Sequence, residues 1–270
     1  MPELPEVETI RKGLAKVLPG RKINEVEILA PKIIKKPSVP VFRRKLLGSR
    51  FTDIRRRGKY LVFDLDPAGC LMVHLKLSGR LIYLPARRVP PEKYLLALSL
   101  SNGSRLYYQD IRRFGGFSLF EKDPLPDLKL GPEPLSREFT PEYWRKILAG
   151  RKTRVKPFLL DQKFVAGLGN IYVSEALFRA RIHPDRPVYS LSAKEQARLY
   201  EAIQSVIREA LACGGTSIQD YVKADGTNGS FQERLFVYRR KGEPCLVCKR
   251  PISVKKDGSR STYFCSRCQK

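Results

Sequence analysis

The chain has 270 residues, enough for about two domains with cores of their own. Hydrophobic residues make up 42% and charged residues 29% of the sequence, a balance typical of a folded chain and not of a disordered one. Uncharged runs such as residues 94–104 are shorter than the roughly 18 residues of a membrane-spanning helix. The N-terminus has no basic and apolar leader. We therefore expect neither a membrane protein nor a secreted one.

Positive charge is the strongest compositional signal. The chain has 52 Lys and Arg against 27 Asp and Glu, a net charge of +25. Such an excess destabilises a compact chain by self-repulsion, so a polyanionic partner is its natural explanation. The basic residues are spread along the whole chain, which favours a folded binding face over a basic tail. Nucleic acid is the expected partner, and ribosome association or an anionic membrane surface are the alternatives.

The first half of the chain changes from one helix to a series of short strands. Apolar residues at a 3-4-3 spacing predict a helix over residues 5–18, with Pro5 suited to its first turn. Between residues 22 and 120, β-branched and aromatic runs predict closely spaced strands, and Asn102-Gly103 marks a hairpin turn. The clearest runs are 60–65, 71–75, 81–84, 94–100 and 105–108. This pattern is typical of an antiparallel sandwich or barrel.

A proline-rich stretch, residues 123–134, separates these strands from a mainly helical region. Thr140-Pro141 predicts one helix start. Ser192 and Glu195 form a capping-box pattern for a longer helix that ends before the Gly214-Gly215 pair. We therefore expect an α+β, multidomain chain, with a β domain first and a helical domain second.

Four cysteines near the C-terminus have the spacing of a zinc site. Two Cys-x2-Cys pairs are separated by sixteen residues, and four thiolates make a closed, structural site. Its members are Cys245, Cys248, Cys265 and Cys268. Two disulfides are the alternative, but no secretion signal supports an oxidising compartment. We interpret Cys70 and Cys213 as packing residues, and the surplus of Lys and Arg in residues 245–270 favours contacts with phosphates.

Three glutamates lie within the first eight residues of this basic chain. The simplest interpretation is that they complement the positive end of a helix dipole. Chemistry is the alternative, because removal of Met1 gives Pro2 a secondary amine. An α-amine has a pKa of about 7.7–8.0, against about 10.4 for lysine, so part of it is unprotonated at neutral pH. Such an amine can form an iminium with a sugar carbon, while Glu3 beside it supplies a proton.

Six sequence blocks together resemble the bacterial formamidopyrimidine-DNA glycosylases, which repair 8-oxoguanine. The blocks occur in the family's order: Pro2-Glu-Leu-Pro-Glu-Val-Glu-Thr9, Arg57-Gly-Lys-Tyr60, His74-Leu-x-x-Ser-Gly79, Asp110-x-Arg-Arg-Phe-Gly115, Gly167-Leu-Gly-Asn-Ile-Tyr-x-Ser-Glu175 and the four-cysteine tail. The resemblance implies an N-terminal antiparallel β-sandwich with an N-terminal helix, a C-terminal helical domain with a helix-two-turn-helix, and a zinc-finger β-hairpin. The implied domains are residues 1–130, 131–235 and 236–270.

The resemblance also implies a bifunctional DNA glycosylase and abasic-site lyase. Such an enzyme excises 8-oxoguanine and formamidopyrimidines and cuts the strand by β,δ-elimination. Pro2 matches the family's Schiff-base nucleophile and Glu3 its general acid. Lys59 matches the residue that assists β-elimination, and Arg260 the residue that assists δ-elimination and contacts phosphate. The implied cofactor is one structural zinc ion, and the implied partner is damaged double-stranded DNA.

The same matching assigns DNA contacts. The wedge that fills the space of a flipped-out nucleotide matches Leu77, Arg112 and Phe114. Further contacts match His74, Lys93, Arg151 and Asn170. The chain departs from the family in that Leu77 replaces methionine, Ile111 replaces proline, and the segment at Lys93 lacks the usual histidines. Gln219 replaces a lysine of some relatives, in a loop over residues 216–233 that the resemblance places at the flipped base.

Two other functions stay open at this point. An endonuclease VIII-like enzyme for oxidised pyrimidines would have the same fold, but it typically has glycine where Leu4 stands. A non-enzymatic protein that binds damaged DNA would keep the fold without the chemistry, and the presence of Pro2, Glu3 and Lys59 argues against it. We expect a monomer without membrane association, located in the bacterial cytoplasm and associated with the nucleoid through DNA binding.

Overall fold

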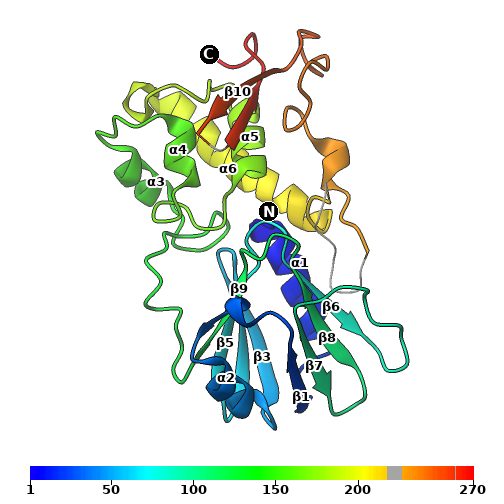
Figure 1. The fold of residues 1–270 in the computed structure, drawn as a ribbon. Helices are drawn as coiled ribbons and strands as arrows, with labels where there is room; N and C mark the ends of the chain where they lie inside the picture. The colour runs from blue at the N-terminus through cyan, green and yellow to red at the C-terminus, as the bar shows by residue number, and fades with distance from the viewer. Residues whose placement is uncertain (218–226, 259) are drawn as a thin grey trace. The chain divides into compact units, whose positions relative to one another are not determined.

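The computed structural model describes residues 1–217, 227–258 and 260–270, which form two compact units (Figure 1). The first unit joins residues 1–129 with 213–230, and the second joins 130–212 with 231–270. The described residues 213–217 and 227–230 therefore belong to the first unit, although they follow a long helix of the second. Each unit has buried apolar residues of its own.

Helix α1 (Leu4–Ala15) opens the first unit and begins at an acidic capping box. The Glu3 carboxylate accepts a hydrogen bond from the backbone N–H of Glu6, and the Glu6 carboxylate accepts one from the N–H of Glu3 at 2.8 Å. The apolar residues of α1 are buried, and the helix packs against strands β3 (Arg50–Arg57) and β4 (Tyr60–Asp66). The predicted helix is confirmed, although it ends at Ala15 because the next two residues form a turn.

Two β-sheets share one core in the first unit. Their strand orders are β1-β7-β8-β6 and β2-β9-β5-β4-β3. The strands are β1 (Ile23–Ile28), β2 (Ile34–Lys36), β3 (Arg50–Arg57), β4 (Tyr60–Asp66), β5 (Gly69–His74), β6 (Arg80–Leu84), β7 (Leu96–Leu100), β8 (Arg105–Gln109) and β9 (Gly116–Phe120). Among the described strands only β2 and β9 pair in parallel. Buried residues of both sheets, such as Phe63 and Leu98, lie in the same cluster, which confirms the β-sandwich.

Helix α2 (Val39–Leu46) is not predicted by the sequence pattern and lies in a stretch expected to form strands only. Its start has Ser38 at the N-cap position and Pro40 in the first turn. Phe42 and Leu46 lie one turn apart and are fully buried. The expectation is wrong here because two buried apolar residues in a short segment make too weak a helical period.

Four helices form most of the second unit: α3 (Pro141–Leu148), α4 (Val155–Leu160), α5 (Asn170–Arg179) and α6 (Ala193–Ala212). The Thr140 hydroxyl accepts a hydrogen bond from the N–H of Tyr143 at 3.1 Å, so the predicted N-cap of α3 is confirmed. Ser192 and Glu195 exchange the two hydrogen bonds of the capping box predicted for α6. The segment between β9 and α3 forms neither helix nor strand, as expected for the proline-rich stretch.

The second unit ends in a hairpin of β10 (Ser253–Asp257) and β11 (Arg260–Phe264), paired antiparallel. Short 3-10 turns are η1 (Pro31–Ile33), η2 (Val188–Ser190) and η3 (Phe231–Arg234). Across the part of the chain that is described, none of the helices has the length and apolar character needed to span a bilayer.

Candidate active site and zinc centre

Pro2 and Glu3 are both buried at the start of α1. Glu3 is only 1% exposed, and the capping box fixes its backbone and carboxylate together. Met1, whose removal would free the Pro2 amine, is 42% exposed and thus open to processing. A buried carboxyl group directly after a potential amine nucleophile is the arrangement that general acid catalysis needs.

Glu6 connects the start of α1 to the segment that precedes residue 218. One of its carboxylate oxygens accepts from the N–H of Glu3, and the other accepts from the N–H of Thr216 at 2.7 Å. A Cβ atom at Gly215, where φ is +83°, would lie 2.8 Å from the Glu6 carboxylate. The close approach of the two segments therefore requires glycine at this position. Gln219, singled out in the sequence, lies outside the described residues.

A half-buried ion-pair group holds α1 against β3. Glu8 accepts hydrogen bonds from Arg11 of the same helix and from Arg56 of β3, the latter at 2.8 Å. Burial alone would raise the pKa of Glu8, but the hydrogen bonds from Arg11 and Arg56 outweigh it and lower the pKa. The carboxylate is therefore ionised at neutral pH and keeps the helix start next to the β3–β4 hairpin.

Lys59 lies in the tight turn of that hairpin. Arg57 and Tyr60 pair across the turn, so Gly58 and Lys59 are its two central residues. Gly58 has a φ of +56°, and a positive φ at the first central position favours glycine. Lys59 is 7% exposed, unusually buried for a lysine. This burial separates Lys59 from the many solvated lysines of the chain.

His74 ends β5 and is held in one tautomer. Its Nδ1 accepts a hydrogen bond from the N–H of Lys76 at 2.9 Å, and its ring meets the edge of Tyr60 at 4.6 Å between centroids. Burial lowers the pKa of His74 to about 3, and the charges of Lys76 and Lys59 contribute. The ring is therefore neutral at physiological pH and carries its proton on Nε2, from which it can donate to an anion.

The three residues matched to a wedge lie on two loops of the first unit. Leu77 is half-buried between β5 and β6, whereas Arg112 and Phe114 are exposed between β8 and β9. Phe114 is 54% exposed, and the Arg112 guanidinium lies 5.2 Å from its ring centroid. Lys93 is exposed before β7, and its carbonyl accepts a hydrogen bond from Gln109.

The second unit brings the other matched residues onto α5, the hairpin and the loop after α3. Asn170 begins α5, and its side-chain amide donates to the carbonyl of Ser261 at 2.9 Å. This bond holds the residue that follows Arg260, which is exposed at the start of β11. Arg151 lies after α3, with its guanidinium 4.6 Å from the ring centroid of Phe164.

Lys156 provides a second connection between α4 and the hairpin. It is 2% exposed, and its ammonium donates to the Thr262 hydroxyl at 2.7 Å and to the Ser261 carbonyl at 3.2 Å. Gln162 braces the turn before α5 by accepting from the N–H of Gly167 and donating to the carbonyl of Leu168. The surface that presents Asn170 and Arg260 is therefore fixed by side chains behind it.

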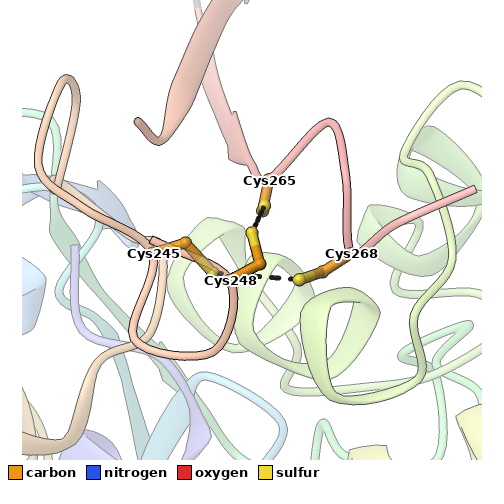
Figure 2. Close-up of side chains that lie close together, drawn as sticks. All are labelled: Cys245, Cys248, Cys265 and Cys268. Carbon is orange, nitrogen blue, oxygen red and sulfur yellow. Dashed lines mark hydrogen bonds between the residues drawn. The ribbon is translucent and has the colours of Figure 1, made fainter. Parts of the chain in front are cut away.

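The four tail cysteines converge as Figure 2 shows, with all four sulfurs within 4.8 Å of one another. The Sγ atoms of Cys245 and Cys268 are 3.9 Å apart, and those of Cys248 and Cys265 are 3.4 Å apart. A tetrahedral zinc site with Zn–S bonds of about 2.3 Å separates its sulfurs by roughly 3.8 Å. The thiols are unpaired and fit this ion, so the zinc prediction is favoured over disulfides.

Four buried polar residues hold these parts together although the sequence pattern predicts no role of this kind for them: Glu6, Asp110, Lys156 and Glu175. Three of the four lie inside the sequence blocks that resemble the glycosylase family. Their position in those blocks is the only signal that the sequence contains for them. Lys156 lies outside the blocks and reads as one more basic surface residue until its burial is known.

Comparison with known proteins finds family models along most of the chain. Residues 1–117 match the formamidopyrimidine-DNA glycosylase N-terminal domain, residues 130–222 match the H2TH domain of the same enzymes, and residues 242–270 match a zinc finger found in FPG and IleRS. The formamidopyrimidine-DNA glycosylase of Pelotomaculum thermopropionicum is 45% identical over all of this chain and 99% of its own length. That of Bacillus subtilis is 43% identical over the same shares. This chain belongs to the formamidopyrimidine-DNA glycosylase family.

Solved structures of the family agree with the fold over the whole chain. A Lactococcus lactis FPG variant bound to Fapy-dG DNA superposes with a TM-score of 0.92 at 36% identity, covering 100% of both chains. MutM in complex with carbocyclic 8-oxo-G DNA gives the same values. The resemblance inferred from the motifs is thus confirmed, together with the β-sandwich, the H2TH domain and the four-cysteine zinc finger of this glycosylase family.

Proposed function

We propose that this chain is a base-excision-repair enzyme that removes 8-oxoguanine and formamidopyrimidines from double-stranded DNA and then cuts the strand. The observation that carries the proposal is the buried Pro2-Glu3 pair on a capped helix, within a chain that matches the glycosylase family over its full length. Relatives of the same fold are solved in complex with Fapy-dG, 8-oxo-G and abasic-site DNA, and the basic excess of this chain suits the same partner.

In this proposal the Pro2 amine forms a bond to C1′ of the damaged nucleotide, and the bond from C1′ to the base breaks. Glu3 donates a proton to the ribose ring oxygen, which opens the sugar and leaves an iminium at C1′. Loss of a C2′ proton then expels the 3′ phosphate, and a second elimination expels the 5′ phosphate. Water finally hydrolyses the iminium, which breaks the bond between Pro2 and C1′ and restores the free amine. Lys59 assists the first elimination, and Arg260 contacts the phosphate of the second.

Binding of the lesion requires its nucleotide to leave the duplex. Leu77, Arg112 and Phe114 fill the space that it leaves. His74, Asn170 and Arg151 contact backbone phosphates, His74 through its neutral Nε2–H and Asn170 at the first turn of a helix. Lys93 adds a further phosphate contact. Zinc, bound by the four cysteines, stabilises the hairpin that carries Arg260 and supplies no catalytic group.

The proposal includes three domains, a monomeric state and a cytoplasmic location. Residues 1–130 form the catalytic domain, 131–235 the H2TH domain and 236–270 the zinc finger. The enzyme acts as a monomer in the cytoplasm, on the DNA of the nucleoid. Sedimentation of the protein with and without a lesion duplex measures its oligomeric state, and a dimer in either sample contradicts the monomer.

Borohydride trapping on an 8-oxoguanine duplex tests the chemistry. The processed enzyme should give a covalent adduct whose mass spectrum places the DNA on Pro2. A matched sample has an N-terminal extension that ends directly before Pro2, so that its nitrogen is a tertiary amide without nucleophilicity. This sample should bind DNA with similar affinity but give no adduct until a protease removes the extension. An adduct that persists with the extension in place overturns the nucleophile assignment.

Lesion choice is tested by comparing excision from an 8-oxoguanine:cytosine duplex with excision from a thymine-glycol duplex. We expect the first substrate to be strongly preferred. Preference for thymine glycol would instead identify an enzyme for oxidised pyrimidines. Absence of trapping on both these duplexes and on an abasic duplex would leave only a zinc-containing DNA-binding protein.

A further inference from the structure

We propose that Asp110 is a positioning residue that joins the loop 75–79 to the loop 110–115 and so makes one rigid wedge. The proposal rests on the function proposed above, because it concerns the residues that replace the flipped-out nucleotide. Asp110 touches no DNA in this proposal. It acts through Leu77 on one loop and through Arg112 and Phe114 on the other.

The carboxylate of Asp110 accepts hydrogen bonds from four groups and is only 3% exposed. One oxygen accepts from the Ser78 hydroxyl at 2.5 Å and from the N–H of Arg112 at 3.2 Å. The other oxygen accepts from the Tyr108 hydroxyl at 3.0 Å and from the N–H of Gly115 at 2.8 Å. Both ends of its own loop and the residue after Leu77 are therefore bonded to one side chain.

Ser78 closes the connection between the two loops. Its hydroxyl donates to Asp110 and accepts from the N–H of Arg112 at 3.1 Å. Ser78 is 2% exposed, so these bonds are shielded from water and correspondingly hard to break. Leu77 directly precedes Ser78 in the chain, and the Arg112 N–H donates to the Ser78 hydroxyl. In this proposal the hydroxyl therefore couples the positions of Leu77 and Arg112.

The backbone around Asp110 is closely packed. A Cβ atom at Gly79 would lie 2.5 Å from the Leu75 carbonyl oxygen, and one at Gly115 would lie 2.0 Å from the Tyr108 hydroxyl. The Tyr108 ring is fully buried and meets Phe117 edge to face at 4.8 Å. Burial, with the neighbouring Asp110 charge, raises the pKa of Tyr108, so its hydroxyl stays protonated and donates.

The outer side of the same loops is apolar and exposed. Ile111 is 83% exposed and Phe114 54% exposed, with Arg112 against the Phe114 ring. An exposed apolar tip over a fully bonded buried base is the form required of a wedge that enters a base stack. Unstacking costs energy, and a loop that yields to the stack cannot supply it. We infer that the Asp110 network serves to keep the tip rigid.

Asp110→Asn should break or weaken this network whichever way the amide lies. Its NH2 group must replace one of the two carboxylate oxygens, and each oxygen faces a backbone N–H, either that of Arg112 or that of Gly115. The hydroxyls of Ser78 and Tyr108 can turn to accept, but a backbone N–H cannot. With the NH2 group towards Gly115 that end of the loop 110–115 is released, and with the NH2 group towards Arg112 the Arg112 N–H keeps only the Ser78 hydroxyl at 3.1 Å. The side-chain volume stays the same in both cases.

The experiment places 2-aminopurine opposite an 8-oxoguanine analogue and follows its fluorescence in stopped flow, alongside excision. Asp110→Asn should slow nucleotide extrusion and excision from the duplex by tenfold or more. Borohydride trapping on a single-stranded abasic oligonucleotide, which needs no extrusion, should stay within twofold of the unsubstituted enzyme. Asp127→Asn, on an exposed aspartate of the same unit, is the matched control and should match the unsubstituted enzyme in both assays.

The outcomes separate this proposal from the function on which it rests. Failure of the unsubstituted enzyme to trap abasic DNA overturns the proposed function. Normal extrusion by Asp110→Asn overturns the positioning role, as does an equal loss of extrusion and of single-stranded trapping. Tyr108→Phe removes one donor and leaves both backbone bonds, so it serves if Asp110→Asn does not fold, and it should slow extrusion several-fold with trapping unchanged.

Discussion

Replacing Glu175 by glutamine should destabilise the second unit. Glu175 lies on α5 with 0% exposure and accepts three backbone hydrogen bonds. Its Oε2 accepts from the N–H of Phe236 at 2.8 Å, and its Oε1 accepts from those of Val237 at 3.0 Å and Tyr238 at 2.8 Å. These residues lead into the zinc finger, so one carboxylate connects α5 to the tail.

The expected loss follows from counting donors. Glutamine keeps one acceptor oxygen, which serves two N–H groups, and its NH2 group then faces the third. A buried donor without a partner costs about 1–3 kcal/mol, and the two remaining bonds weaken because their acceptor is no longer charged. Burial raises the pKa of Glu175 while the three N–H groups oppose that rise, so glutamine also removes the cost of burying a charge. The net decrease in the free energy of unfolding is about 2 kcal/mol.

Guanidinium unfolding at saturating zinc measures this loss, since bound metal otherwise contributes to the apparent stability. The midpoint should fall while the slope m stays constant. Glu201→Gln, on an exposed position of α6, is the matched control and should change stability by less than about 0.5 kcal/mol. If Glu175→Gln loses no more than the control, the three hydrogen bonds do not stabilise this connection and the reasoning is refuted.

Three further changes test other parts of the structure. Ile111 is at the second position of a turn that the N–H of Arg113 closes by donating to the carbonyl of Asp110 at 3.2 Å, and proline is favoured at this position. Ile111→Pro should therefore raise the free energy of unfolding by about 0.4–1 kcal/mol. A decrease in the free energy of unfolding would contradict this turn. Arg186 lowers the pKa of Glu195 to about 2, so the pair stabilises the fold above the unfolded pKa, and this contribution is lost as the pH falls from about 4.5 towards 2. Glu195→Gln should remove that part of the acid unfolding curve. An unchanged curve argues against a stabilising role of the pair. Chelation of zinc should reduce duplex binding by unfolding the tail, and readdition of zinc should restore it. Trapping at saturating abasic DNA should be largely kept. Complete loss of trapping at saturating DNA would point to a direct role of the metal in the chemistry.

The sandwich could be predicted because its strands carry local signals. Asn102-Gly103 specifies a hairpin turn, and Gly103 has the positive φ that this turn needs. Thr140 likewise predicts the start of α3, because an N-cap residue and the proline after it are local signals. Helix α2 could not be predicted, since its stability comes from burying Phe42 and Leu46 against other elements and not from its own period.

The residues of the candidate site likewise fall into those with a signal in the sequence and those whose contacts only the fold shows. The four cysteines could be named from their spacing alone, whereas Pro2 and Glu3 could be named only because the block around them resembles the glycosylase family. Asp110, Lys156 and Glu175 could not be assigned their contacts, because each bonds to groups that the fold brings from elsewhere in the chain: the loop before β6, the terminal hairpin, or the segment before the zinc finger.

Those contacts indicate how the reactive side chains are held in position. Glu3 and Lys59 lie at the tips of local elements, a helix start and a two-residue turn, and contacts from other elements add to the local hydrogen bonds that hold the helix start. Glu6 and Glu8 bond α1 to Thr216 and to β3, in the same way that Asp110 bonds the wedge loops. Buried carboxylates that accept backbone or guanidinium N–H groups recur at each of these points, in a chain with nearly twice as many basic as acidic residues. We infer that the few buried acids among the described residues are concentrated where loops must be held, whereas the basic residues, Lys59 and Lys156 excepted, remain outside the core and available to DNA.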